Sequence, residues 1–315
     1  MSEDVSELAV LSALSTGISR IGKHQSDMKG GERLTDGGNG KRLYYTTVSF
    51  LCMLLILLFA VIIMPQGVDY DIVNLRNLMA DDGHIIHAGG FLNAGEVQVS
   101  YTNSLEALEN MYAKGNRFCE IDLQETADGM LICGHGDENE LVFGTGLSPD
   151  ATGEEFMNCR IWGKFTPLSA SELAAFVQEH PDLYIITDVK TDNIRVCKRI
   201  AAEYPHLKDR IVVQIQLPEE YDKLREMGFR YIMYPIFKTP DGERGVLSLA
   251  TFARRHELVA LIVPNGYYSP DFKLSLAEKI IGVPIVLHTL NDEWEINYYL
   301  NHNLALAVYS DRTDL

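Results

Sequence analysis

The sequence predicts a (β/α)8 barrel preceded by a single transmembrane helix. From about residue 82 onward, short runs rich in β-branched residues alternate with amphipathic helical stretches, and this alternation gives eight strand units with seven helices between them. Upstream, residues 43–64 form an apolar run without a charged residue. Periodicity alone leaves an open, doubly wound α/β sheet as the structural alternative to the barrel.

Residues 43–64 (LYYTTVSFLCMLLILLFAVIIM) are the expected membrane span. At ~1.5 Å per residue, a helix of this length covers the ~30 Å of a bilayer core. The run is too long for a signal peptide, and no small-x-small cleavage site follows it. Cations precede it and acidic residues follow it, so the positive-inside rule predicts a single-pass protein of the cell membrane. We expect a cytoplasmic polar tail over residues 1–42, a linker over 65–81 and an extracytoplasmic barrel domain over 82–315.

The composition restricts the partners of this domain. The formal net charge of the chain is −17, which repels nucleic acids unless a cation bridges the two. The five cysteines include no C-x-x-C pair, which argues against a zinc cluster or a disulfide-dense scaffold. We therefore expect no nucleic-acid partner, whereas the disulfide state and the oligomeric state stay open.

Each expected barrel unit begins with a strand. The strands are expected at residues 84–88, 118–124, 130–135, 184–190, 211–216, 231–237, 258–264, 284–289 and 305–310. The helices are expected at residues 104–114, 169–180, 194–203, 219–227, 247–256, 274–281 and 293–301. No helix separates 118–124 from 130–135, so these strands are expected to form a hairpin or an excursion. Residues 137–166 are expected to form a surface loop near the barrel mouth. Asn103 and Ser104 are expected to cap the first helix, with Asn103 also a candidate for the mouth.

Acidic side chains lie at the carboxyl ends of two expected strands, where barrel enzymes place their chemistry. Glu120 and Asp122 share one face of a strand, because residues i and i+2 point the same way. Asp188 lies on a nearby strand. Three carboxylates suit Mg²⁺ or Ca²⁺ better than zinc. We therefore expect one divalent metal ion, Mg²⁺ or Ca²⁺, bound by Glu120, Asp122 and Asp188.

Two histidines and a lysine are expected beside this ion. His87 ends the first strand and His135 ends the excursion strand, and imidazoles suit general acid and base catalysis near neutral pH. Lys190 shares a strand face with Asp188, so its charge is available to an anionic substrate oxygen.

Three segments, HIIHAGG, TNSLEAL and FCEIDLQETADGMLICGH, resemble the N-terminal signature of the glycerophosphodiester phosphodiesterase family. That signature is a strand ending in His-Arg-Gly, a helix start Asn-Thr-x-x-Ala-Phe, then E-x-D-x-x-x-T-x-D-G and a closing His-Asp. Later segments that resemble the family are FTPLSASELAAF, ITDVK, VLHTLND and VYSDRTD, so the resemblance runs from residue 85 to residue 311.

The resemblance implies cleavage of a phosphodiester to a phosphomonoester and an alcohol, with Mg²⁺ or Ca²⁺ as cofactor. The implied roles are an acid/base pair of His87 and His135, metal binding by Glu120, Asp122 and Asp188, and phosphate binding by Lys190. Which histidine is the acid and which is the base stays open.

The chain departs from the family pattern at several positions. Ala88 stands where the family has an arginine that can bind phosphate through two hydrogen bonds. Gly89 permits a close backbone approach, so its N–H group is a candidate phosphate ligand. Asp188 replaces the usual glutamate, as in the related sphingomyelinase D-type barrels, and His288 stands where a tryptophan is usual.

We therefore expect a membrane-anchored, metal-dependent phosphodiesterase. Its substrate is expected to be a glycerophosphodiester or a related phosphodiester of the cell envelope or of lipid headgroups. Two alternatives stay open. One is a phospholipase-like or sphingomyelinase D-like lyase of the same superfamily, which would release a cyclic phosphate. The other is an inactive barrel that acts as a binding protein.

Overall fold

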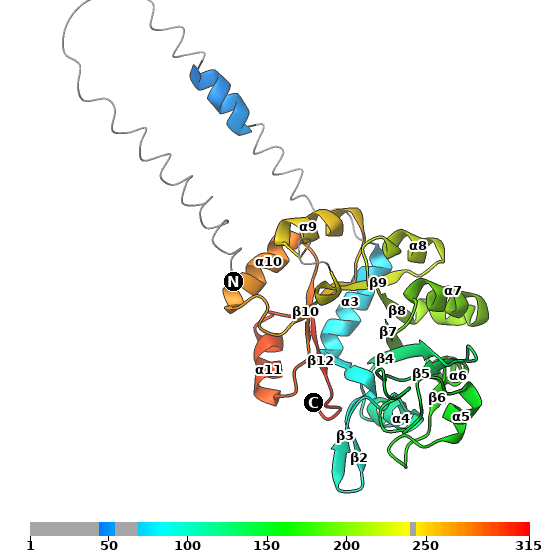
Figure 1. The fold of residues 1–315 in the computed structure, drawn as a ribbon. Coiled ribbons are helices and arrows are strands. Elements are labelled where there is room, and N and C mark those ends of the chain that lie inside the picture. Colours follow the sequence, from blue (N-terminus) through cyan, green and yellow to red (C-terminus); the bar gives the residue numbers. More distant parts are fainter. Residues whose placement is uncertain (1–43, 54–68, 240–243) are drawn as a thin grey trace, which may run out of the picture. The chain divides into compact units, whose positions relative to one another are not determined.

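The computed structural model describes residues 44–53, 69–239 and 244–315 (Figure 1). Residues 44–53 are helical. Within the described ranges, no helix combines the length and the apolar character needed to cross a bilayer. Most of the expected span over 43–64, and the expected tail over 1–42, lie outside the described residues, so both stay predictions.

Eight parallel strands close into a barrel, as predicted. They are β1 (His84–Ile86), β4 (Phe118–Glu125), β7 (Tyr184–Val189), β8 (Ile211–Gln214), β9 (Tyr231–Pro235), β10 (Ala260–Pro264), β11 (Ile285–His288) and β12 (Ala307–Ser310). Strand β1 pairs with β12 on one side and with β4 on the other, which closes the sheet. This closure excludes the open, doubly wound alternative.

Helices follow the strands on the outside of the barrel, and all seven expected helices are present (Figure 1). They are α4 (Leu105–Ala113), α6 (Ala170–Glu179), α7 (Asn193–Glu203), α8 (Glu220–Glu226), α9 (Val246–Arg255), α10 (Asp271–Ile281) and α11 (Glu293–Asn301). Local chemistry sets their ends. For example, Ser169 and Glu172 form a capping box at the start of α6, and Gly282 adopts the left-handed conformation that ends α10.

A further helix, α3 (Tyr70–Asp82), occupies most of the segment that the sequence analysis assigned to a linker over 65–81. Its residues Ile72, Leu75 and Met79 are fully or almost fully buried and pack in a cluster with inward-facing strand residues such as Phe118. Their spacing of three and four is that of one helix face. Residues 70–81 are therefore helix rather than linker, and α3 covers the barrel end at which the strands begin (Figure 1).

The predicted excursion after β4 is present. Strand β5 (Leu131–Cys133) pairs antiparallel with β4, and β6 (Leu168–Ser169) pairs with β5. The loop over 137–166 contains α5 (Gly153–Asn158) and has its own apolar cluster around Val142, Phe156 and Ile161. A hairpin of β2 (Leu92–Ala94) and β3 (Val97–Val99) precedes α4. These additions lie near the carboxyl end of β4.

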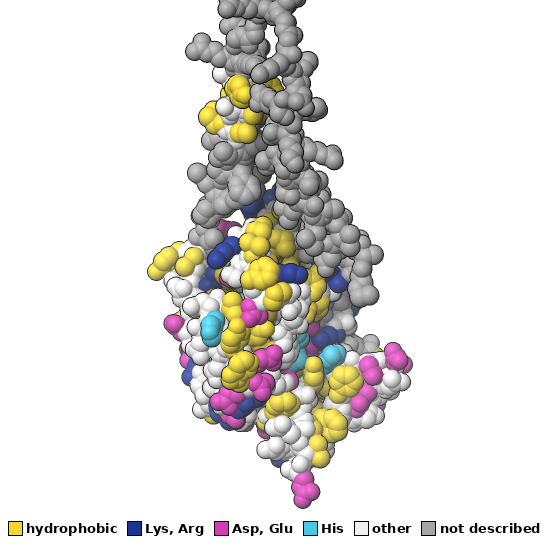
Figure 2. All heavy atoms as spheres, turned by 90° about the vertical axis from the view of Figure 1, so that its left-hand side faces the viewer, with side chains coloured by type: hydrophobic (Ala, Val, Ile, Leu, Met, Phe, Trp, Pro, Cys, Tyr) yellow, Lys and Arg dark blue, Asp and Glu magenta, His cyan; other side chains and the backbone are white. Residues whose placement is uncertain are grey.

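The outer surface of the barrel is not uniformly polar. Figure 2 faces the side of the molecule on which α10 and α11 lie in Figure 1, and it shows apolar side chains among charged ones. Phe272 and Leu276 of α10 and Trp294 of α11 are exposed apolar residues.

Candidate active site

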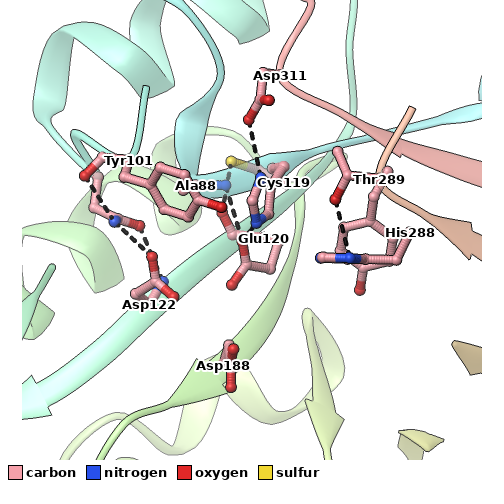
Figure 3. Close-up of polar contacts among 12 residues, drawn as sticks. Ala88, Tyr101, Cys119, Glu120, Asp122, Asp188, His288, Thr289 and Asp311 are labelled. Carbon is pink, nitrogen blue, oxygen red and sulfur yellow. Dashed lines mark hydrogen bonds and ion pairs between the residues drawn. The ribbon is translucent and has the colours of Figure 1, made fainter. Parts of the chain in front are cut away.

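The three predicted metal ligands converge at the carboxyl ends of β4 and β7 (Figure 3). The two strands are neighbours in parallel register, with Asp122 opposite Asp188 and Glu120 two residues earlier on the same face as Asp122. One oxygen atom from each carboxylate lies within 4.8 Å of the other two. The spacings E-x-D and D-x-K thus place three oxygen donors around one point.

This cluster fits a divalent cation. The side chains of Glu120 and Asp122 are 3% and 2% exposed, so little water screens their charges from each other. Burial, together with the negative charge of Asp122, raises the pKa of Glu120 to about 8. A cation between the carboxylates would relieve this repulsion, and Mg²⁺ and Ca²⁺ prefer oxygen donors of this kind.

Two lysines contact the same carboxylates. Lys190 Nζ lies 2.7 Å from Asp122 Oδ1 and 2.8 Å from Asp188 Oδ2. Lys238 ends η3 (Ile236–Lys238), the short turn after β9, and its Nζ contacts Asp188 Oδ1. Burial raises the pKa of Asp188, but the charges of Lys238 and Lys190 outweigh burial and lower it overall. The structure therefore brings Lys190 to the cluster as predicted and adds a second ammonium group.

His87 is buried in η1 (His87–Gly89), directly after β1. Its Nδ1 lies 2.9 Å from Asp311 Oδ1, and its Nε2 lies 3.9 Å from Glu120 Oε2. Asn291 orients Asp311 by donating to Oδ2 over 2.7 Å and by accepting from its backbone N–H over 2.8 Å. Burial lowers the pKa of His87, but the hydrogen bond to Asp311 and the charge of Glu120 outweigh burial and raise it overall. His87 therefore holds a proton more readily than an exposed histidine.

His135 follows β5, and the ring of Tyr101 lies between it and His87. The Tyr101 ring centroid is 4.8 Å from that of His87 and 5.5 Å from that of His135. Burial lowers the pKa of His135, and its Nδ1 is buried without a hydrogen-bond partner among the described residues. The pKa values of the two histidines are therefore shifted in opposite directions.

The backbone around the missing arginine takes part in the site. The N–H group of Ala88 donates to Glu120 Oε2 over 2.8 Å, which orients that carboxylate. The N–H group of Gly89 donates to the sulfur of Cys119, and a Cβ on Gly89 would lie 2.6 Å from Cβ of Ala107 in α4. Close packing against α4 therefore accounts for this glycine. The N–H group of Gly89 therefore already has a partner. No observation tests the phosphate contact expected of it, which stays a prediction.

Asn103 supports Asp122 instead of capping the helix. Its Nδ2 donates to Asp122 Oδ2 over 2.9 Å, and its Oδ1 accepts from the backbone N–H of Asp122 over 3.0 Å. Ser104 alone caps α4, by accepting from the backbone N–H of Ala107. Placement of Asn103 at the mouth is thus confirmed.

The sequence predicts no role for Tyr101, Lys238 or Asp311. Asp311 and Lys238 directly follow expected strands, and a position at a strand end is what singled out the other site residues. Tyr101 lies in a loop, and its backbone φ of 57° is the only local sign of a constrained position.

A family model and a curated relative match this chain in sequence. The model of the glycerophosphoryl diester phosphodiesterase family matches residues 94–243. Glycerophosphodiester phosphodiesterase 1 of Bos taurus is 25% identical over 254 residues, an alignment that covers 69% of this chain and 74% of the bovine protein.

Solved structures share the barrel. Glycerophosphodiester phosphodiesterase of Thermotoga maritima has a TM-score of 0.54 at 19% identity, over 74% of this chain and 95% of its own. An Oleispira antarctica phosphodiesterase, solved with its product sn-glycerol-3-phosphate, has a TM-score of 0.52 at 17% identity, over 73% of this chain and 93% of its own. These two likenesses establish the fold. The family model and the bovine relative assign residues 94–243 of this barrel to the glycerophosphoryl diester phosphodiesterase family, whose members are phosphoric diester hydrolases.

Proposed function

We propose that this protein hydrolyses glycerophosphodiesters, with one divalent cation, Mg²⁺ or Ca²⁺, at Glu120, Asp122 and Asp188. The observation that carries the proposal is the convergence of these carboxylates beside two imidazoles whose pKa values are shifted in opposite directions. The names of the bovine relative and of the Thermotoga enzyme, and the product bound to the Oleispira enzyme, support this substrate class.

The carboxylates are oriented before any ligand arrives, because the Ala88 N–H group holds Glu120 and Asn103 holds Asp122 at two points. A bound cation would neutralise charge on the phosphate oxygens and orient the phosphorus for attack. Lys190 contacts the phosphate and adds to this neutralisation.

The directions of the two pKa shifts support a different proposed role for each histidine. His135 has a lowered pKa, so it is neutral near pH 7 and accepts a proton from the nucleophile, which is water or a neighbouring substrate hydroxyl. His87 has a raised pKa, so it keeps a proton to higher pH than His135 does, and it donates this proton to the leaving alkoxide oxygen. Asp311 stabilises the charged form of His87 and fixes its ring.

A second candidate reaction is favoured by one observation, the pairing of Asp188 with Lys190 in place of the glutamate usual in the family. The same Asp-x-Lys pattern occurs in sphingomyelinase D-type barrels. In a lyase reaction of that kind, a substrate hydroxyl attacks the phosphorus and a cyclic phosphate is released. His135 could accept the proton of either nucleophile.

We also propose that residues 43–64 anchor the protein in the cell membrane, with residues 1–42 in the cytoplasm and the barrel outside. The charge-free apolar run and the cations upstream of it support this placement. The substrate would then be a phosphodiester at the cell surface, such as an envelope polymer or a lipid headgroup. Protease added to intact cells should digest the barrel, and full protection of the barrel would contradict this topology.

Hydrolysis of bis-p-nitrophenyl phosphate tests the proposed activity. Wild type should be active only with a divalent cation, whereas His87→Ala and Glu120→Ala should be inactive. Phosphorus NMR of the product from a glycerophosphodiester should show a phosphomonoester, and a cyclic phosphate would instead establish the lyase. Equal activity in all three proteins would contradict the assigned site. Wild type that binds substrate without turnover would be a binding protein.

A further inference from the structure

We propose that Lys238 is a substrate-binding residue that supplies the positive charge missing at position 88. Its ammonium group binds an anionic oxygen of the phosphodiester when a cation occupies the carboxylate cluster. This inference rests on the proposed function and adds a residue to that site.

Lys238 and Lys190 bind the two oxygens of one carboxylate. Lys238 Nζ contacts Oδ1 of Asp188, and Lys190 Nζ lies 2.8 Å from Oδ2. The two lysine side chains are 22% and 24% exposed, so each remains partly accessible to solvent while its ammonium group contacts Asp188. A divalent cation bound to Asp188 would repel both ammonium groups, because like charges a few ångströms apart in a partly buried site interact strongly. An anionic ligand would then be the nearest replacement partner for each ammonium group.

The charges of the site support the same conclusion. The cluster has three carboxylates, and two lysines are in contact with it. A divalent cation would leave this group with one net positive charge, which a phosphodiester, a monoanion, neutralises. Without Lys238 the loaded site would have no net charge and no long-range attraction for its substrate. The family arginine would supply this charge at position 88, where this chain has Ala88.

The backbone that carries Lys238 is tied to the site. The turn η3 directly follows β9, so it lies at the barrel end where the carboxylates lie. The ring of its Phe237 has its centroid 5.6 Å from that of His288, and the His288 ring lies 5.0 Å from the ring of His87. The turn that carries Lys238 therefore packs against rings of the active site.

Calorimetric titration of the full chain with sn-glycerol-3-phosphate, at saturating Mg²⁺ or Ca²⁺, tests the inference. Lys238→Met should weaken binding by about tenfold or more, as expected for loss of a charge-assisted hydrogen bond. Lys238→Arg should retain most of the affinity. Lys223→Met, which removes an exposed lysine of α8, is the matched control and should bind like wild type.

Titration with the cation alone is the second readout. Lys238→Met should bind the cation at least as tightly as wild type, because an ammonium group that competes for Asp188 is gone. Lys238→Gln keeps a hydrogen-bond donor without the charge, and it carries the test if Lys238→Met does not fold.

Unchanged product affinity in Lys238→Met or Lys238→Gln, with cation binding intact, would overturn the inference and leave Lys238 as an ion-pair partner of Asp188. A wild-type protein that binds neither cation nor product would contradict the proposed function itself, and the inference would fall with it.

Discussion

The same strands build both ends of the barrel, but their inward-facing side chains differ in kind from one end to the other. From its beginning to its end, β4 points Phe118, Glu120 and Asp122 inward, and β7 points Tyr184, Ile186 and Asp188 inward. The rings of Phe118 and Tyr184 stack with centroids 5.3 Å apart, in the half of the barrel covered by α3. The other half holds the buried carboxylates.

The apolar end of the barrel therefore stabilises the fold, and the acidic end carries the proposed chemistry. Apolar packing under α3 stabilises the fold, because burial removes hydrocarbon from water at about 25 cal/mol per Å². The carboxylate end opposes folding when no cation is bound, since burial disfavours the charged form of Glu120. Substitutions at the two ends should therefore have opposite consequences.

The largest expected effect is the loss of activity in Glu120→Gln. Removal of one electrostatic contribution to a transition state costs about 10²–10³ in rate, and the loss of a metal ligand should cost at least that much. In the presence of a chelator, the melting temperature of Glu120→Gln should not be lower than that of wild type, because the substitution also removes a buried carboxylate whose pKa is raised. Kinetics and thermal melts measure both quantities. Global unfolding of Glu120→Gln would mean that the carboxylate is structural.

His135→Ala should lose about 10²–10⁴ in kcat, the usual contribution of a general base. The fold should be little disturbed, because the His135 side chain is only partly buried and its Nδ1 makes no hydrogen bond with the described residues. Rate assays with a substrate that has a good leaving group check the role. If kcat stayed unchanged with such a substrate, His135 would not be the base.

Leu75→Ala tests the opposite end. Leu75 of α3 is 1% exposed, so its truncation should lower the free energy of unfolding by about 2–5 kcal/mol. Because α3 covers the end of the barrel away from the carboxylates, kcat per folded molecule should stay at the wild-type value. Urea denaturation and kinetics together provide the measurement. A full loss of activity in a folded Leu75→Ala protein would show that the two ends are coupled.

The smallest expected effect is on the pH profile of kcat/KM. The rate should rise as His135 loses its proton, at a pH below the usual histidine pKa, and fall as His87 loses its proton, at a pH above it. Asp311→Asn removes the charge that helps to raise the pKa of His87. Only the alkaline limb of the profile should then move, and it should move to lower pH. Movement of the acidic limb instead would reverse the two roles.

How much the sequence predicts depends on whether the signal is local. The alternation of strands and helices and the spacings E-x-D and D-x-K are local, so the barrel and the three carboxylates could be predicted. The contact of Asp311 with His87 joins residues 224 positions apart, and that of Lys238 with Asp188 joins residues 50 apart. No local pattern encodes such pairs. Helix α3 has a local signal in the spacing of Ile72, Leu75 and Met79, which the prediction of a linker over 65–81 missed.

The central claim, that three carboxylates hold one divalent cation, is tested most directly by calorimetric titration of the chelator-treated protein with Mg²⁺ and Ca²⁺. Wild type should bind one ion per chain, and Glu120→Gln, Asp122→Asn and Asp188→Asn should each lose that binding. Asp150→Asn, at an exposed acidic residue outside the cluster, should bind like wild type. Binding that persists undiminished in all three cluster variants, or no binding in wild type, would contradict the account.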